Sequence, residues 1–257
     1  MASDSKKNKM SIRKSIPNFI TSLNLICGTV AVIMAFRGYE LWAVYLILAA
    51  AVFDFFDGFA ARLLKAYSPM GKELDSLADL ISFGLAPASL IYMRYSELVS
   101  DALAGKINIF LIEAISLVPV FIAVGSALRL AKFNVDTRQS ENFIGVPTPA
   151  NAILIISFLH YTVFNPHFFP FEYTLWFWPL ASLLLSWLLI SNIPMFSLKM
   201  KSVAWKENKV RFIFAGAAVL GAAAVAISGV KWSLWLMLLI LSYILYNSSV
   251  YIAGRHE

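Results

Sequence analysis

Residues 41–61 read LWAVYLILAAAVFDFFDGFAA, and this apolar run is long enough to cross a lipid bilayer as a single helix. Its charged residues are Asp54 and Asp57. An aspartate at the centre of a membrane helix costs about 2.5–3.5 kcal/mol on insertion scales, so two in one span need a compensating partner. The stretch therefore predicts a membrane protein in which buried carboxylates have a function.

Similar apolar runs follow one another along the whole chain of 257 residues. Hydrophobic residues make up 60% of the chain and charged residues 14%, whereas a soluble domain carries about 25% charged residues. We expect an all-α, polytopic membrane bundle of about eight transmembrane helices. The runs lie at residues 16–36, 41–61, 72–95, 107–131, 148–164, 173–192, 210–229 and 231–252.

The basic residues indicate the orientation of these helices. With the N-terminus in the cytoplasm, most of the 21 lysines and arginines fall on the cytoplasmic side. The exceptions are Arg37, Arg94, Lys106 and Lys231. This bias predicts that both termini are cytoplasmic. The net charge of +6 lies in patches between apolar runs, which favours contact with lipid headgroups over nucleic acid.

We expect two parts in the chain: a basic cytoplasmic segment at residues 1–15 and a single membrane domain at residues 16–257. The residues that suggest chemistry lie within about residues 16–150. These features predict an integral membrane protein, in the cell membrane, with its site facing the cytoplasm.

Helical spacing gathers the polar residues of the second and third runs into two faces. Asp54, Asp57, Gly58, Ala61 and Arg62 share one face of the second helix, and Gly71, Asp75 and Asp79 share one face of the third. The connection at residues 63–70 is short and contains Ser68-Pro69. The two helices should therefore be antiparallel neighbours whose carboxylate faces meet.

Clustered carboxylates repel one another unless a cation lies between them. Oxygen ligands without histidine or cysteine suit Mg²⁺, Mn²⁺ or Ca²⁺, and a hard metal held this way serves phosphoryl transfer. Two other interpretations are open at this point. The aspartates could form buried ion pairs or a polar seam, or they could line a proton or ion pathway.

The spacing Asp54-x2-Asp57-Gly58-x2-Ala61-Arg62-x8-Gly71-x3-Asp75-x3-Asp79 resembles, at every fixed position, the signature of the CDP-alcohol phosphatidyltransferase family. The resemblance implies a homodimeric transferase that joins an alcohol to the phosphatidyl group of CDP-diacylglycerol and releases CMP. It further implies two ions, Mg²⁺ or Mn²⁺, held by the four aspartates, with Asp79 as the general base.

Residues outside this core resemble the serine-using branch of the family. They are Pro17-Asn18-x2-Thr21-x2-Asn24, residues 74–79 with Ser82-Phe83-Gly84, residues 129–135 and Phe143-x-Gly145-x-Pro147-x-Pro149-Ala150. The resemblance implies that L-serine is the alcohol. It implies contacts to the nucleotide and CDP-lipid from Asn18, Thr21, Asn24, Gly58, Ala61, Arg62 and Gly71. Arg129, Phe133 and Asn134 are the candidates for the serine pocket.

Other interpretations of these flanking motifs stay open. Asn18, Thr21 and Asn24 could be helix-packing contacts, and Arg129 could be an ordinary cytoplasmic anchor. Lys132 stands where the branch more often has arginine. Within the family, inositol, inositol phosphate or glycerol phosphate could replace serine, and CDP-archaeol could replace CDP-diacylglycerol. An ion or proton transporter is the remote alternative.

Overall fold

The computed structural model describes residues 2–103, 109–135, 143–196 and 205–254. In order along the chain, its first elements are α1 (Ala2–Phe36), α2 (Glu40–Leu64), α3 (Pro69–Asp79), the π-helix η1 (Leu80–Leu85), α4 (Ala86–Leu103), α5 (Ile109–Ser116) and α6 (Val120–Val135). They are followed by β1 (Phe143–Ile144), α7 (Thr148–Phe164), the 3₁₀-helix η2 (Pro166–Phe168), α8 (Phe171–Ile190), β2 (Pro194–Met195), α9 (Trp205–Ser228) and α10 (Trp232–Ala253).

The predicted all-α membrane bundle is confirmed. Within the described residues, 7 helical stretches are long and apolar enough to cross a membrane, judged by length and composition. The remaining expected run forms α7, an apolar helix of 17 residues. The third expected run is composite, because α3, η1 and α4 follow one another without a break. The basic segment predicted at residues 1–15 is helical from Ala2 onwards and continues directly into the first span.

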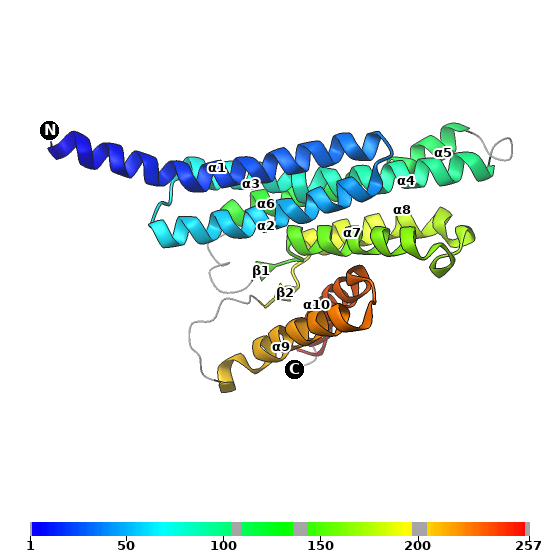
Figure 1. Cartoon of the computed structure of the whole chain (residues 1–257). Helices are drawn as coiled ribbons and strands as arrows, with labels where there is room; N and C mark the ends of the chain where they lie inside the picture. The colour runs from blue at the N-terminus through cyan, green and yellow to red at the C-terminus, as the bar shows by residue number, and fades with distance from the viewer. Residues whose placement is uncertain (1, 104–108, 136–142, 197–204, 255–257) are drawn as a thin grey trace.

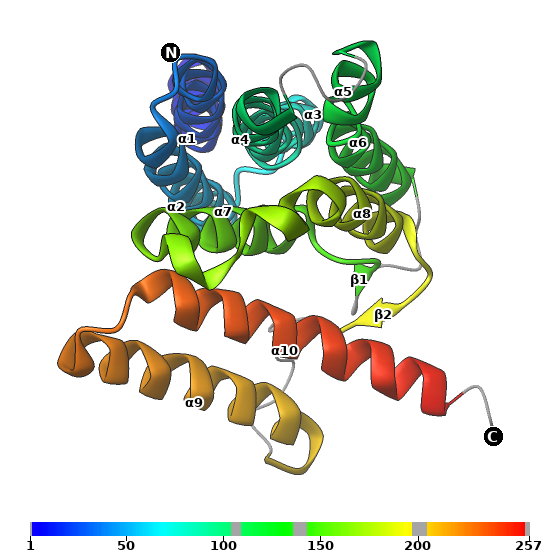
Figure 2. The same cartoon turned by 90° about the vertical axis from the view of Figure 1, so that its right-hand side faces the viewer.

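Figure 1 shows how the helices are layered. α1 and α2 lie side by side along the length of the molecule with α3, α4 and α6, and α7 and α8 form the layer beneath them. α9 and α10 are the elements furthest from α1. Figure 2 looks nearly along the axes of α1 and α4 and shows α10 at full length, so α10 lies across the bundle beneath α7.

The largest core lies between the layers. Buried apolar side chains include Ile47 of α2, Phe83 of η1 and Ile155 of α7. A second, smaller core joins Met195 of β2 to Ile244 of α10. Lipid tails are as apolar as these side chains, so close packing and hydrogen bonds hold such helices together more than the hydrophobic effect does. Small residues therefore decide how near two helices can come.

The α2–α3 connection is defined by local backbone chemistry. Lys65 ends α2 in a left-handed conformation (φ 50°), and its N–H donates to the carbonyls of Ala61 and Arg62. Ser68 then caps α3, since its Oγ accepts a hydrogen bond from the Gly71 N–H at 3.0 Å, and Pro69 occupies the first helical turn. The short connection places the start of α3 near the end of α2.

The first helix approaches the third span very closely. A side chain at Gly28 would collide with Ser82, so only glycine fits there. Ser82 Oγ donates a hydrogen bond of 3.0 Å to the Asn24 carbonyl, which pins η1 against α1. α1 packs against both α2 and α3. The polar faces of α1, α2 and α3 consequently converge in one region.

Candidate metal and substrate site

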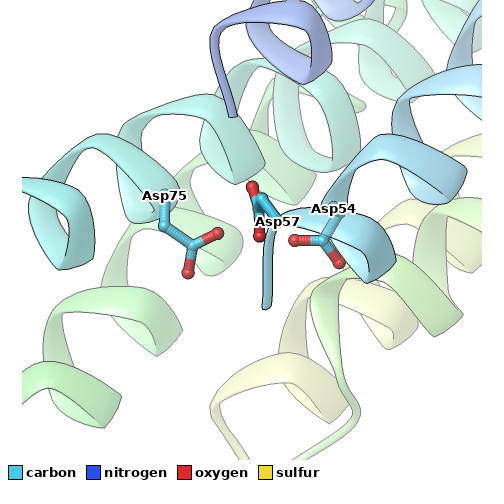
Figure 3. Close-up of side chains that lie close together, drawn as sticks. All are labelled: Asp54, Asp57 and Asp75. Atoms are coloured by element: carbon cyan, nitrogen blue, oxygen red, sulfur yellow. The ribbon is translucent and has the colours of Figure 1, made fainter. Parts of the chain in front are cut away.

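Three carboxylates meet where α2 faces α3. Asp54 and Asp57 come from α2 and Asp75 from α3, and Figure 3 shows their side chains lying close together. Each residue offers one carboxylate oxygen, and these oxygens all lie within 4.8 Å of one another. The meeting of two carboxylate faces that the helical spacing predicts is therefore present in the structure.

This cluster fits a hard divalent cation. Oxygens bound to one Mg²⁺ or Ca²⁺ lie at most about 4–5 Å apart, which is twice the metal–oxygen distance. Asp57 is buried, and its Oδ2 has no hydrogen-bond partner among the described residues. Three negative groups at this separation repel one another strongly, and a cation removes that repulsion. The donor set, the spacing and the unpaired oxygen all suit a metal ion.

Asp79 lies next to these three aspartates but does not belong to the group whose oxygens lie within 4.8 Å of one another. It ends α3, it is 8% exposed, and its carboxylate contacts that of Asp54. The Asn24 amide donates to Asp79 Oδ1 at 3.4 Å. Asp79 is thus held from α1 on one side and faces Asp54 of the carboxylate cluster on the other. A group in this position could both contact a metal and accept a proton.

The π-helix η1 begins directly after Asp79 and was not predicted from the sequence. The Ala86 N–H donates to the Ile81 carbonyl, five residues earlier, as in a π-helix. Pro87 has no N–H and removes the next α-helical bond. Such one-turn π segments are common at functional sites. Here the segment brings Ser82 and Gly84 against α1 and α6.

The expected nucleotide residues on α1 line the same region. Asn18 is half-buried, and its Oδ1 would lie 2.9 Å from a Cβ atom added at Gly71. Thr21 is buried, donates to the Pro17 carbonyl at 3.0 Å and also lies beside Asp57. Asn24 has no exposed surface, and its Oδ1 has no partner among the described residues. Thr21 and Asn24 therefore face the aspartates, and Asn18 lies against the first turn of α3.

The remaining motif positions lie around the cluster in different ways. At Gly58 an added Cβ would have Arg62 Nη1 at 3.7 Å as its nearest neighbour, so the backbone there is open to a ligand. At Gly71 the close neighbours are Asn18 and Ser68, so that glycine is required by protein packing. Ala61 is half-buried and Arg62 is exposed at the end of α2, near the aspartates but free to turn.

The three residues expected in a serine pocket lie on α6. Arg129 is buried, and its Nη1 donates to Thr148 Oγ1 at 3.0 Å. Phe133 contacts Phe143, and the Arg129 guanidinium lies over the same Phe143 ring at 5.8 Å. Asn134 joins α6 to α3, because its amide donates to Ser76 Oγ at 2.9 Å. Arg129 also lies close enough to Asp79 for their charges to attract.

Three buried polar residues near Arg129 were missed from the sequence. Ser126 lies three residues before Arg129 on α6, and Thr148 and Asn151 lie at the start of α7. All three have no exposed surface. A threonine and an asparagine three apart in an apolar membrane helix are a polar signal, but their meaning depended on knowing that Arg129 reaches Thr148.

Comparison with known proteins identifies the family of this chain. The family model described as CDP-alcohol phosphatidyltransferase matches residues 14–191, from within α1 to the end of α8. A CDP-diacylglycerol–serine O-phosphatidyltransferase of Mycobacterium bovis is 34% identical over 82% of this chain and 70% of its own. The enzyme of that name from Bacillus subtilis is 39% identical over 56% of this chain and 76% of its own. That from Methanocaldococcus jannaschii is 37% identical over 58% and 63%.

Proposed function

The chain belongs to the CDP-alcohol phosphatidyltransferase family, and on that premise we propose that it is a phosphatidylserine synthase. It transfers the phosphatidyl group of CDP-diacylglycerol to L-serine and releases CMP. The names of its relatives support serine as the alcohol. The observation that carries the chemistry is the group of carboxylate oxygens from Asp54, Asp57 and Asp75 within 4.8 Å of one another.

We infer that Asp54, Asp57, Asp75 and Asp79 hold two divalent cations, Mg²⁺ or Mn²⁺. When bound, such ions neutralise the diphosphate and stabilise the charge on departing CMP. The nucleotide and phosphates would be bound by Asn18, Thr21, Asn24, Gly58, Ala61 and Arg62, and Gly71 would let Asn18 pack closely against α3. Arg62 offers a planar guanidinium to phosphate oxygens, and the open backbone at Gly58 admits close approach.

Asp79 is the residue proposed to accept the serine proton. The serine hydroxyl oxygen forms a bond to the lipid-side phosphorus as the bond from that phosphorus to the CMP oxygen breaks. The hydroxyl proton passes to the Asp79 carboxylate, which Asn24 orients through its amide. Arg129, attracted to Asp79 by charge, would hold the serine carboxylate, with Phe133 and Asn134 closing the pocket.

The location of the site supports a cytoplasmic active centre in the cell membrane. Arg62, Lys65 and Lys72 lie at the end of the bundle that holds the α2–α3 connection, close to the carboxylates. The positive-inside rule places such residues on the cytoplasmic face, where serine is available. We also propose a homodimer, for which the exposed apolar faces of the chain leave ample surface.

CMP release by the purified full-length protein tests the function. CDP-diacylglycerol would be supplied with L-serine, inositol, glycerol phosphate or no alcohol, and with CDP-archaeol replacing the lipid in a parallel series. We expect release that depends on L-serine and on a divalent cation. Release with inositol or glycerol phosphate but not with serine would assign another alcohol. Ion movement in proteoliposomes without CMP release would overturn the enzyme assignment.

A further inference from the structure

On α6 and α7, several buried polar atoms have no hydrogen-bond partner among the described residues. Arg129 uses Nη1 to bond Thr148, while its buried Nε makes no hydrogen bond. The free Nε–H points to a missing acceptor, since a guanidinium can only donate hydrogen bonds. An anionic group of a ligand is the partner that would satisfy it.

Asn151 is the clearest of these unpaired groups. It has no exposed surface, and neither its Oδ1 nor its Nδ2 has a hydrogen-bond partner in the described part of the chain. It lies three residues after Thr148, so the two share one face of α7. A buried amide left unpaired destabilises the folded chain, and a bound ligand is the partner that would offset that loss.

Ser126 provides a third unpaired group. It has no exposed surface, and its Oγ has no hydrogen-bond partner in the regions that the structure describes. It lies about one turn before Arg129 on α6. α6 ends, and α7 begins, at the side of the bundle where the β1 strand lies (Figure 1). Ser126 and Asn151 are therefore both about one turn deeper than the Arg129–Thr148 hydrogen bond.

The chemistry of these groups matches a zwitterion. We propose that Arg129, Asn151 and Ser126 form a recognition pocket for the α-amino acid moiety of the alcohol substrate. The Arg129 guanidinium binds the carboxylate, which only accepts hydrogen bonds, and Asn151 Oδ1 and Ser126 Oγ accept from the ammonium, which only donates. This inference rests on the proposed function and extends it, because it assigns the residues that reject alcohols lacking one of the two charges.

The test compares one substitution at two asparagines. Asn151→Leu replaces an unpaired amide with an apolar side chain of similar size. Asn247→Leu makes the same change in α10, where Oδ1 accepts from the Phe196 N–H at 3.0 Å and Nδ2 donates to the Tyr243 carbonyl at 2.7 Å. KM values for L-serine and CDP-diacylglycerol would be measured with thermal unfolding of the full chain in detergent.

Asn151→Leu should raise the KM for L-serine about ten- to hundredfold, as expected for a lost hydrogen bond to a charged group. The KM for CDP-diacylglycerol should stay within about twofold, and the unfolding temperature should be unchanged or higher. Asn247→Leu should lower the unfolding temperature and leave the KM for L-serine unchanged. This contrast separates a ligand contact from a structural one.

Inhibitors that each lack one charge identify which group is bound. 3-Hydroxypropanoate has no ammonium, so Asn151→Leu should leave its inhibition constant unchanged while the serine KM rises. Ethanolamine has no carboxylate, so Arg129→Leu should leave its inhibition constant unchanged. An unaltered serine KM in Asn151→Leu, or equal weakening of serine and 3-hydroxypropanoate, would overturn the pocket. A wild-type protein that does not use serine at all would instead overturn the proposed function.

Discussion

Buried polar side chains in the α9–α10 hairpin differ from those in the helices before it. In α10, Ser233 Oγ lies 2.8 Å from His160 Nδ1, and both ends of the Asn247 amide are hydrogen-bonded. Among the described residues, every buried side-chain nitrogen or oxygen without a hydrogen-bond partner lies between residues 24 and 157. These atoms belong to Asn24, Glu40, Asp57, Ser96, Ser126, Arg129, Asn134, Asn151 and Ser157.

The difference restricts the unpaired candidates for ligand binding to the helices before the hairpin. A paired buried amide fixes how two helices meet, while an unpaired one costs about 1–3 kcal/mol of stability until something binds it. The two spans that differ most in burial lie on either side of this division, because 61% of an 18-residue apolar stretch within Pro69–Glu97 is buried and none of one within Asn208–Ser228. We therefore propose that the helices up to α7 carry the chemistry and that the hairpin presents apolar surface.

Metal removal should have the largest effect on activity, and the effect should depend on carboxylates of the helices before the hairpin. Chelation should abolish CMP release, and added Mg²⁺ or Mn²⁺ should restore it. Metal at a hundredfold excess over its Kd should also stabilise the fold by about 2.7 kcal/mol, seen as a higher unfolding temperature. Asp57→Asn should remove this response, and Glu113→Gln, an exposed carboxylate on α5, should keep it. Equal responses in both variants would exclude the aspartate cluster as the metal site.

Asp79→Asn should lower turnover by about 10²- to 10⁴-fold, the usual contribution of a general base. The asparagine Oδ1 can still accept the hydrogen bond from Asn24, so the fold should be retained. A metal-dependent rise in unfolding temperature should remain, reduced by the loss of one ligand, since the trio of Asp54, Asp57 and Asp75 is intact. Single-turnover CMP release measures the effect. Turnover near wild type with metal still bound would remove Asp79 from the role of base.

Gly71→Ala should have a smaller effect, transmitted through α1. The new Cβ would lie 2.9 Å from Asn18 Oδ1 and 3.0 Å from Ser68 Oγ, so Asn18 must move. We expect a loss of about 1–3 kcal/mol of stability, as for other overpacked sites, and a higher KM for CDP-diacylglycerol. Gly58→Ala meets only ordinary contact inside α2 and should raise the unfolding temperature slightly, as replacing an unhindered helical glycine does. Equal unfolding temperatures for both variants would argue against the close packing of α1 on α3.

Much of the structure of the helices before the hairpin could be predicted from the sequence, because the sequence patterns that define it are local. Apolar runs longer than a bilayer identify the spans, and helical spacing places Asp54 with Asp57 and Asp75 with Asp79. The Ser68-Pro69 pair indicates a helix start, and the structure has one there. The proximity of Asp54, Asp57 and Asp75 follows from these features alone.

The rest depends on contacts between distant segments. Asn151 and Asn247 look alike in sequence, since each is an asparagine in an apolar helix, yet one is unpaired and the other doubly bonded. The π-helix after Asp79 reflects the packing of Ser82 on α1 as well as the missing N–H of Pro87. Hydropathy identifies α10 as a possible span but contains no information on the direction in which it crosses α7.

The smallest expected effects on stability come from substitutions at two glycines of α9, which test the packing of the hairpin. A Cβ at Gly216 would have no neighbour within 4 Å, whereas one at Gly221 would collide with Trp235. Gly216→Ala should therefore add about 0.5–1 kcal/mol of helix stability, and Gly221→Ala should lower stability, with the serine KM unchanged in both.

The oligomeric state of Gly216→Ala then tests whether the surface of α9 packs against a partner chain. If the homodimer forms elsewhere on the chain, Gly216→Ala should keep the wild-type fraction of dimer in detergent, measured by light scattering. If α9 packs against a partner chain, the added methyl should weaken a close helix contact and release monomer. That result would give the hairpin a role in assembly while leaving the chemistry with the earlier helices, because neither glycine is near the unpaired polar atoms.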